Sequence, residues 1–174
     1  MIDPFTNISK NICIVGIPKC GTVSLETYLK ERFPDKEVRR IEQIWKGKEG
    51  IEKALDKFPD WHYVIILRDN SERIWSNYYF FQMNKTMTLE EYLNFHSDIF
   101  KRLGESNPIK QGNYGHWLKI WSKVNPIIIT LEDAKQLENF PHENKTGDKK
   151  TYPEMTEVDR KLITSYLERE NDIE

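Results

Sequence analysis

Residues 16–24, with the sequence GIPKCGTVS, place one lysine, two glycines and two hydroxyl side chains within nine positions. Lys19 supplies a positive charge, and Gly21 lets the backbone come close to a ligand because it has no side chain. The hydroxyls of Thr22 and Ser24 can donate hydrogen bonds to phosphate oxygens. Residue types in this pattern predict a loop that binds an anion.

The segments on either side of this loop indicate how it is held. The apolar run NICIVGI before it predicts a strand, and VSLETYLKERF after it has apolar residues at helical spacing. The first turn of a helix has N–H groups without intrahelical partners and the positive end of the helix dipole. A loop that leads from a strand into such a turn attracts anions.

The loop departs from the nucleoside triphosphatase pattern G-x-x-x-x-G-K-[ST]. Gly16 and Gly21 have the spacing of its two glycines, but Thr22 stands where the pattern has lysine, and the lysine lies inside the loop at position 19. The usual arrangement for binding magnesium is therefore lost. We expect an anion site that does not serve a magnesium-dependent nucleotide hydrolase.

A second group of polar residues follows the apolar run WHYVIIL. Arg68 ends that predicted strand, and Ser76 lies eight residues on, in a predicted helix. Taken singly, Arg68 would form a salt bridge to Asp69 or Glu72, and Ser76 would be an ordinary helix-surface hydroxyl. Because parallel strands bring their carboxyl ends to one edge of a sheet, we expect Arg68 beside the anion loop, where a guanidinium suits a second phosphate.

The composition narrows the class of protein. The chain has 174 residues without an internal repeat or a linker rich in Pro, Gly or Ser, so we expect one domain over residues 1–174. A net charge of −2 argues against a general nucleic-acid partner. No apolar run is long enough for a membrane span and the N-terminus lacks a signal-peptide layout, which predicts a soluble, cytoplasmic protein without a membrane partner.

Cysteine and histidine usage points away from disulfides and metals. Cys13 falls in the first predicted strand and Cys20 in the anion loop, and two cysteines so placed do not suggest a disulfide framework. We expect Cys20 to act through its backbone N–H, the alternative being a reactive thiol. The four histidines show no ligand spacing with each other or with cysteine, so we expect no metal.

The elements along the chain alternate between strands and helices, which predicts an α/β fold. Further strands are expected in KEVRRI and, as a buried strand, in PIIIT. Asn70 and Ser71 are candidates for the N-cap of the helix ERIWSNYYFFQM, and Thr88 with Glu91 forms a capping box. The expected architecture is a single domain with a P-loop-like parallel sheet of about four or five strands, flanked by helices. Helices are expected in KEGIEKALDKF, TLEEYLNFHSDIFKRL, YGHWLKIWSKV, LEDAKQLENF and TEVDRKLITSYLERE.

These residues resemble the sulfotransferases that use 3′-phosphoadenosine-5′-phosphosulfate (PAPS). PKCGTVS is similar to the family signature PK-x-G-T-x-S, and RDNSERIWSNYYF is similar to R-[DN]-P-x-x-R-x-x-S-x-Y, with Asn70 where the family usually has proline. The tail, with an N-K-T loop, a Tyr-Pro pair and a closing helix, resembles the carbohydrate-modifying branches. The resemblance covers most of the chain.

The resemblance implies that PAPS is the co-substrate and that no metal is required. It also implies a role for each signature. Arg68 and Ser76 would bind the 3′-phosphate, and Lys19 would in addition stabilise the bridging oxygen as the sulfuryl group leaves. The 5′-phosphosulfate would be held by the loop residues Lys19, Cys20, Gly21, Thr22, Val23 and Ser24.

The sequence gives a weaker signal for the general base that would take the proton of the acceptor. In the branch acting on heparan-type sugars a glutamate follows the second strand, and Glu42 has a similar spacing; the alternative is a solvated carboxylate paired with Arg39 or Arg40. His116 and Glu37 are the next candidates. The basic loop with Lys145, Lys149 and Lys150 resembles a segment that closes over the 3′-phosphate in relatives, the alternative being a solvated charged loop.

The sequence therefore favours a PAPS-dependent sulfotransferase acting on a hydroxyl or amine, with a sugar as one class of acceptor. Two alternatives stay open, namely a nucleotide-binding module without transferase activity and a P-loop nucleotide kinase.

Overall fold

A four-stranded parallel sheet lies in the first of two compact units into which the chain divides. The computed structural model describes residues 3–41, 47–95, 112–141 and 152–171. The first unit comprises Met1–Arg68 and His116–Lys149, and the second comprises Asp69–Gly115 and Lys150–Glu174. The expected single domain over residues 1–174 stays a prediction.

The sheet has the order β2-β1-β3-β4, and all its neighbouring strands run parallel. Its strands are β1 (Ile12–Gly16), β2 (Val38–Ile41), β3 (His62–Leu67) and β4 (Ile127–Thr130). Every residue of β1 is buried, as expected for an apolar run at the centre of a parallel sheet. The predicted α/β fold with a parallel sheet is confirmed.

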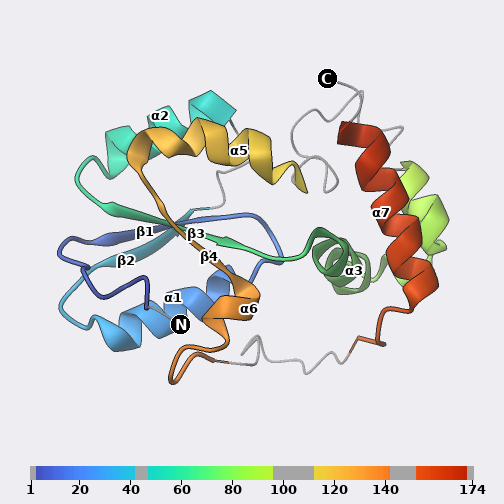
Figure 1. The fold of residues 1–174 in the computed structure, drawn as a ribbon, viewed down its shortest axis with the longest axis horizontal. Helices are drawn as coiled ribbons and strands as arrows, with labels where there is room; N and C mark the ends of the chain where they lie inside the picture. The colour runs from blue at the N-terminus through green and yellow to red at the C-terminus, as the bar shows by residue number, and fades with distance from the viewer. Residues whose placement is uncertain (1–2, 42–46, 96–111, 142–151, 172–174) are drawn as a thin grey trace. The chain divides into compact units, whose positions relative to one another are not determined.

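Helices cover both faces of this sheet (Figure 1). α2 (Gly47–Lys57) and α5 (Tyr114–Trp121) lie over one face, and α1 (Thr22–Arg32) and α6 (Leu131–Ala134) lie over the other. A short 3₁₀ helix, η5 (Ser122–Val124), follows α5. Because α1 follows β1 directly, the β1–α1 loop lies at the carboxyl edge of the sheet.

β4 corrects one expectation. The run PIIIT was expected to be a buried strand, but Ile128 is 48 % exposed and only Ile129 within β4 is buried. The strand order places β4 at the edge of the sheet in the described part of the chain. A continuous apolar run does not reveal a strand's position in the sheet, so an edge strand and a central one look alike in the sequence.

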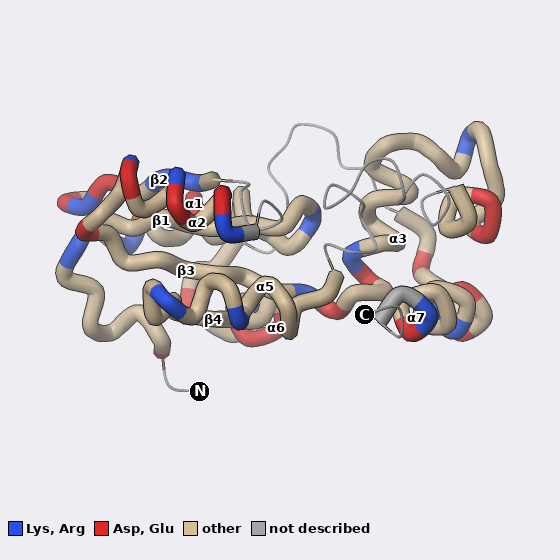
Figure 2. The backbone as a smooth tube through the Cα atoms, turned by 90° about the horizontal axis from the view of Figure 1, so that it is seen from above, with Lys and Arg blue, Asp and Glu red and all other residues tan. Residues whose placement is uncertain are grey.

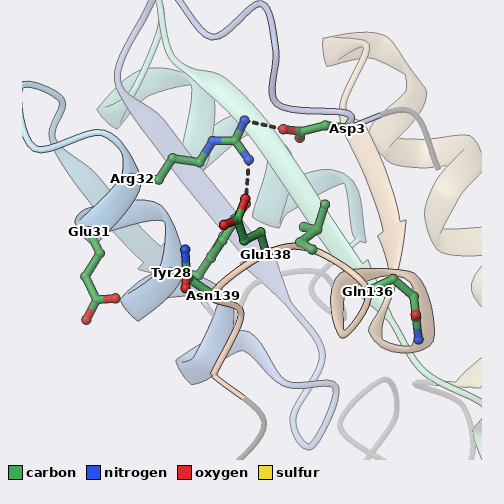
Figure 3. A pocket seen from close by; sticks show the side chains of 8 residues that line it. Asp3, Tyr28, Glu31, Arg32, Gln136, Glu138 and Asn139 are labelled. Atoms are coloured by element: carbon green, nitrogen blue, oxygen red, sulfur yellow. Dashed lines mark hydrogen bonds and ion pairs between the residues drawn. The ribbon is translucent and has the colours of Figure 1, made fainter.

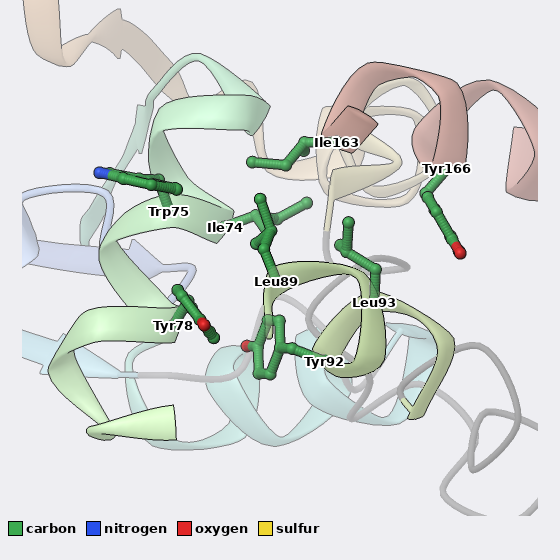
Figure 4. Close-up of a cluster of buried hydrophobic side chains, with 8 residues drawn as sticks. All are labelled: Ile74, Trp75, Tyr78, Leu89, Tyr92, Leu93, Ile163 and Tyr166. Carbon is green, nitrogen blue, oxygen red and sulfur yellow. The ribbon is translucent and has the colours of Figure 1, made fainter. Parts of the chain in front are cut away.

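The second unit packs helices around an apolar cluster (Figure 4). Its elements are α3 (Asn70–Phe80), η2 (Met83–Lys85), a helical segment over residues 89–95 and α7 (Glu157–Asn171). The predicted capping box is confirmed, because Thr88 N donates to Glu91 Oε2 at 2.7 Å and Glu91 N donates to Thr88 Oγ1 at 3.2 Å. The cluster consists of Ile74, Trp75, Tyr78, Leu89, Tyr92, Leu93, Ile163 and Tyr166.

The start of α3 corrects a second expectation. Its N-cap is Asp69, whose side chain accepts a hydrogen bond from Glu72 N at 3.0 Å, whereas Asn70 and Ser71 were the candidates. Asn70 instead donates from Nδ2 to the carbonyl of Gly112 at 2.7 Å. Aspartate and asparagine cap helices about equally well, so adjacent candidates cannot be ranked from the sequence.

Charged residues of both signs occur along α1, α2 and α7. Figure 2 shows Lys and Arg interspersed with Asp and Glu along α1, α2 and α7. Among the described residues, none of the helices has both the length and the apolar character that a membrane span requires.

Candidate functional site

The β1–α1 loop has the backbone geometry expected of an anion site. Lys19 and Gly21 both adopt positive φ, of 70° and 87°, and Cys20 N donates to the carbonyl of Ile17 at 3.3 Å. Gly21 is the N-cap of α1 and has no side chain that could accept from the N–H groups of the first turn. An α-helix offers these N–H groups no partner of its own, so the loop presents donors where the helix dipole is positive.

Gly21 is required at this position for two reasons. Its φ of +87° lies in the left-handed region that glycine adopts without strain. A Cβ built on Gly21 would also lie 2.7 Å from Leu131 Cδ1, so the end of the Leu131 side chain would have to shift. Leu131 is the first residue of α6, directly after β4, and no sequence motif marks it as a residue that shapes the loop.

The electrostatics of α1 favour a negatively charged ligand at its start. The first turn of α1 contains no acidic residue. The nearest acid along the helix, Glu26, is paired with Lys30 at 2.7 Å and with Arg40 of β2 at 3.1 Å. Burial would raise the pKa of Glu26, but the hydrogen bonds from Lys30 and Arg40 outweigh it and lower the pKa, so the carboxylate stays ionised and compensated.

Arg68 reaches the same loop from the next strand. β3 pairs with β1 so that Ile66 lies opposite Gly16, and Arg68 follows two residues later. Its Nη1 donates to the backbone carbonyl of Lys19 at 3.4 Å. The expected meeting of Arg68 with the loop on one edge of the sheet is confirmed, while the ligand roles of both stay predictions.

The hydroxyl residues of both signatures are buried in their own units. Thr22 and Ser24 are buried at the start of α1, and Ser76 is buried within α3. Because Ser76 belongs to the second unit, its predicted role beside Arg68 stays a prediction.

Arg73 is a residue to which the sequence reasoning gave no role. It lies in the quoted pattern RDNSERIWS, three residues before Ser76, and it is fully buried. Its Nε donates to Asn70 Oδ1 at 3.4 Å. A buried guanidinium is costly unless it is hydrogen-bonded, and the bond to Asn70 connects Arg73 to the first residue of α3. The signal in the sequence was the position of Arg73 in the pattern R-[DN]-P-x-x-R.

Several predicted residues lie outside the described residues, namely Glu42, Lys145, Lys149 and Lys150. The two other candidates for the base are described. His116 is exposed on α5 with its ring edge-on to Trp117 at 4.8 Å, and Glu37 is paired with Arg39 at 2.6 Å.

Both cysteines are buried and neither forms a disulfide, in line with the expectation that the chain has no disulfide framework. Burial raises the pKa of Cys13 to about 12, so its thiol stays protonated at neutral pH. The sulfur of Cys20 is likewise enclosed, which favours the interpretation that this residue acts through its backbone.

A cavity of about 790 Å³ lies away from the loop, at the other end of α1 (Figure 3). Arg32 crosses it, held by Asp3 and by the hydroxyl of Tyr28. The other lining residues are Glu31, Gln136, Leu137, Glu138 and Asn139. None of the predicted site residues that the structure describes is among those that line this cavity.

Comparison with known proteins shows a likeness in fold to a solved structure. No family model matches the chain, and no curated protein matches it. The crystal structure of a sulfotransferase from Alicyclobacillus acidocaldarius is similar, with a TM-score of 0.61 and 17 % sequence identity over 73 % of this chain and 75 % of that chain. The chain therefore has a sulfotransferase-like α/β fold, and the β1–α1 loop and Arg68 lie at the carboxyl edge of its parallel sheet.

Proposed function

We propose that this protein is a sulfotransferase that moves the sulfuryl group of PAPS to a hydroxyl or amine acceptor, with a sugar as the first class to test. Lys19, Cys20, Gly21, Thr22, Val23 and Ser24 bind the 5′-phosphosulfate. Arg68 and Ser76 bind the 3′-phosphate. The reaction requires no metal.

The observation that carries this proposal is the contact between Arg68 Nη1 and the carbonyl of Lys19 at 3.4 Å. It joins the first residue of one signature to the lysine of the other. A loop with a single lysine suits one phosphate group, whereas a nucleotide with phosphates at both the 5′ and 3′ positions requires a second cationic group close by. The likeness of the fold to a sulfotransferase supports the same proposal.

The chemistry assigned to the loop is electrostatic. The acceptor oxygen or nitrogen bonds to sulfur while the bond from sulfur to the bridging oxygen of the phosphosulfate breaks. Negative charge then grows on that oxygen, where Lys19 and the first-turn N–H groups of α1 stabilise it. The acceptor proton passes to a base, for which Glu42 is the first candidate, although it lies outside the described residues.

The transfer reaction itself is tested with PAPS labelled in its sulfur. The protein is incubated with labelled PAPS, with EDTA present, and with a panel of sugars, small alcohols and amines. We expect label to appear in at least one acceptor, together with an equal amount of adenosine 3′,5′-bisphosphate.

Two other outcomes identify the alternatives. Tight binding of PAPS without label in any acceptor class would favour a nucleotide-binding module. Transfer of phosphate from MgATP, with no transfer from PAPS, would favour a nucleotide kinase. The control is the same incubation with Gly21→Val, in which a β-branched residue has to adopt the left-handed backbone of the loop at φ +87° and strains it.

A further inference from the structure

Two carboxylates lie in the chain directly after the arginine proposed for the 3′-phosphate. Asp69 follows Arg68 and caps α3, accepting from Glu72 N at 3.0 Å, and Glu72 lies in the first turn. Their side chains are 51 % and 33 % exposed. Two negative charges here would repel a phosphate and attract the Arg68 guanidinium.

Arg160 of α7 holds both carboxylates with one guanidinium. Its Nη1 donates to Asp69 Oδ1 at 3.1 Å and its Nη2 donates to Glu72 Oε1 at 2.6 Å. The hydrogen bond with Glu72 is the largest contribution that raises the pKa of Arg160. The planar fork of arginine makes such a double contact possible, whereas a lysine offers a single point charge.

The start of α7 fixes the position of Arg160. Thr156 caps this helix, with Asp159 N donating to Thr156 Oγ1 at 3.2 Å and Thr156 N donating to Asp159 Oδ2 at 3.1 Å. One turn later the Thr164 hydroxyl lies 3.4 Å from that of Ser71 in α3. Arg160 is therefore aimed at the first turn of α3 by its own helix.

Packing, rather than this ion pair, holds the two helices together. Ile74 of α3 and Ile163 of α7 are both fully buried in the apolar cluster, and Tyr166 packs into it one turn further along α7 (Figure 4). Partly exposed ion pairs contribute little to stability. Arg160 lies 91 residues from Asp69 and 88 residues from Glu72 in the chain. Because its two contacts add little stability, we expect their effect to be electrostatic.

We propose that Arg160 is a positioning residue for the 3′-phosphate: by binding Asp69 and Glu72 it limits their repulsion of the phosphate and their competition for Arg68. This inference rests on the proposed function, because it assumes that Arg68 binds a 3′-phosphate. Arg160 is not assigned any contact with the nucleotide.

The test measures selectivity for the 3′-phosphate. The dissociation constants of adenosine 3′,5′-bisphosphate and adenosine 5′-phosphate are determined by calorimetry, and their ratio is compared among variants. We expect Arg160→Ala to reduce the preference for the bisphosphate by about five- to tenfold, the effect of uncovering two partly screened charges near a dianion. Binding of adenosine 5′-phosphate should change less than about twofold.

Two further variants separate positioning from a structural role. Lys161→Ala removes one positive charge from the same turn of α7, where Lys161 is paired only loosely with Glu157 at 3.8 Å, and should leave the preference unchanged. Adding Asp69→Asn and Glu72→Gln to Arg160→Ala should restore it, because neutral amides do not repel phosphate and asparagine still caps a helix. A purely structural role predicts no such rescue.

The outcomes distinguish this inference from the function on which it rests. If the unchanged protein shows no preference for the bisphosphate, the proposed function fails and this inference fails with it. If the preference is present but Arg160→Ala behaves like Lys161→Ala, or the triple variant is not rescued, only the role of Arg160 is overturned.

Discussion

We expect the Lys19→Met variant to transfer the sulfuryl group about 10²–10³ times more slowly than the unchanged protein. Methionine keeps most of the length of the side chain but removes the charge that stabilises the leaving oxygen. The charge matters more in the transition state than in the bound substrate, so turnover should fall by more than nucleotide affinity. The measurement is single-turnover transfer from labelled PAPS at saturating nucleotide.

A charge elsewhere in the first unit provides the control. Lys53 on α2 is exposed and is paired with Glu49, so Lys53→Met removes the same charge without touching the loop. Its rate should stay within about twofold of the unchanged protein, as is usual for surface substitutions. If Lys19→Met lost nucleotide affinity but kept its turnover at saturation, Lys19 would be a binding residue only.

The second large effect concerns Arg68. Arg68→Ala should weaken adenosine 3′,5′-bisphosphate by about 10- to 150-fold, because a hydrogen bond between charged groups contributes roughly 1.5–3 kcal/mol. Adenosine 5′-phosphate lacks the group that Arg68 is proposed to bind, so its affinity should change little. Competition calorimetry with the two nucleotides gives both dissociation constants from one preparation of the variant.

The contact of Arg68 with Lys19 supplies the alternative explanation. If Arg68 only supports the loop through the Lys19 carbonyl, its loss should weaken both nucleotides alike. Arg39→Ala is the matched control, because Arg39 on β2 is 62 % exposed and paired with Glu37. It removes a guanidinium from the same unit and should affect neither nucleotide.

The parts of the fold with a local signal could be predicted from the sequence. The strand, loop and helix of the candidate site were predictable from the apolar runs of β1 and β3 and from the glycine in the loop after β1. Buried parallel strands consist of apolar residues, and a left-handed backbone favours glycine. The capping box at Thr88 was predictable for the same reason. The edge position of β4 was not, since an apolar run carries no information about neighbours.

Contacts between distant segments were beyond a single sequence. The collision of a Cβ at Gly21 with Leu131 joins residues 110 positions apart, which follows from their numbers in the chain. The ion pairs of Arg160 with Asp69 and Glu72 likewise depend on the packing of α7 beside α3. Local propensity does not report such pairings. The choice between Asp69 and Asn70 as the cap had a different cause, because both residue types cap helices about equally well.

The central claim is that the loop and Arg68 select a nucleotide with a 3′-phosphate and need no metal. The most direct measurement is the melting temperature of the unchanged protein with adenosine 3′,5′-bisphosphate in EDTA, compared with ATP and magnesium. At about a hundred times the dissociation constant a ligand adds roughly 2.7 kcal/mol to stability, which a thermal melt detects readily. The account predicts a clear rise with the bisphosphate and a much smaller one with MgATP; an equal or larger rise with MgATP would contradict it.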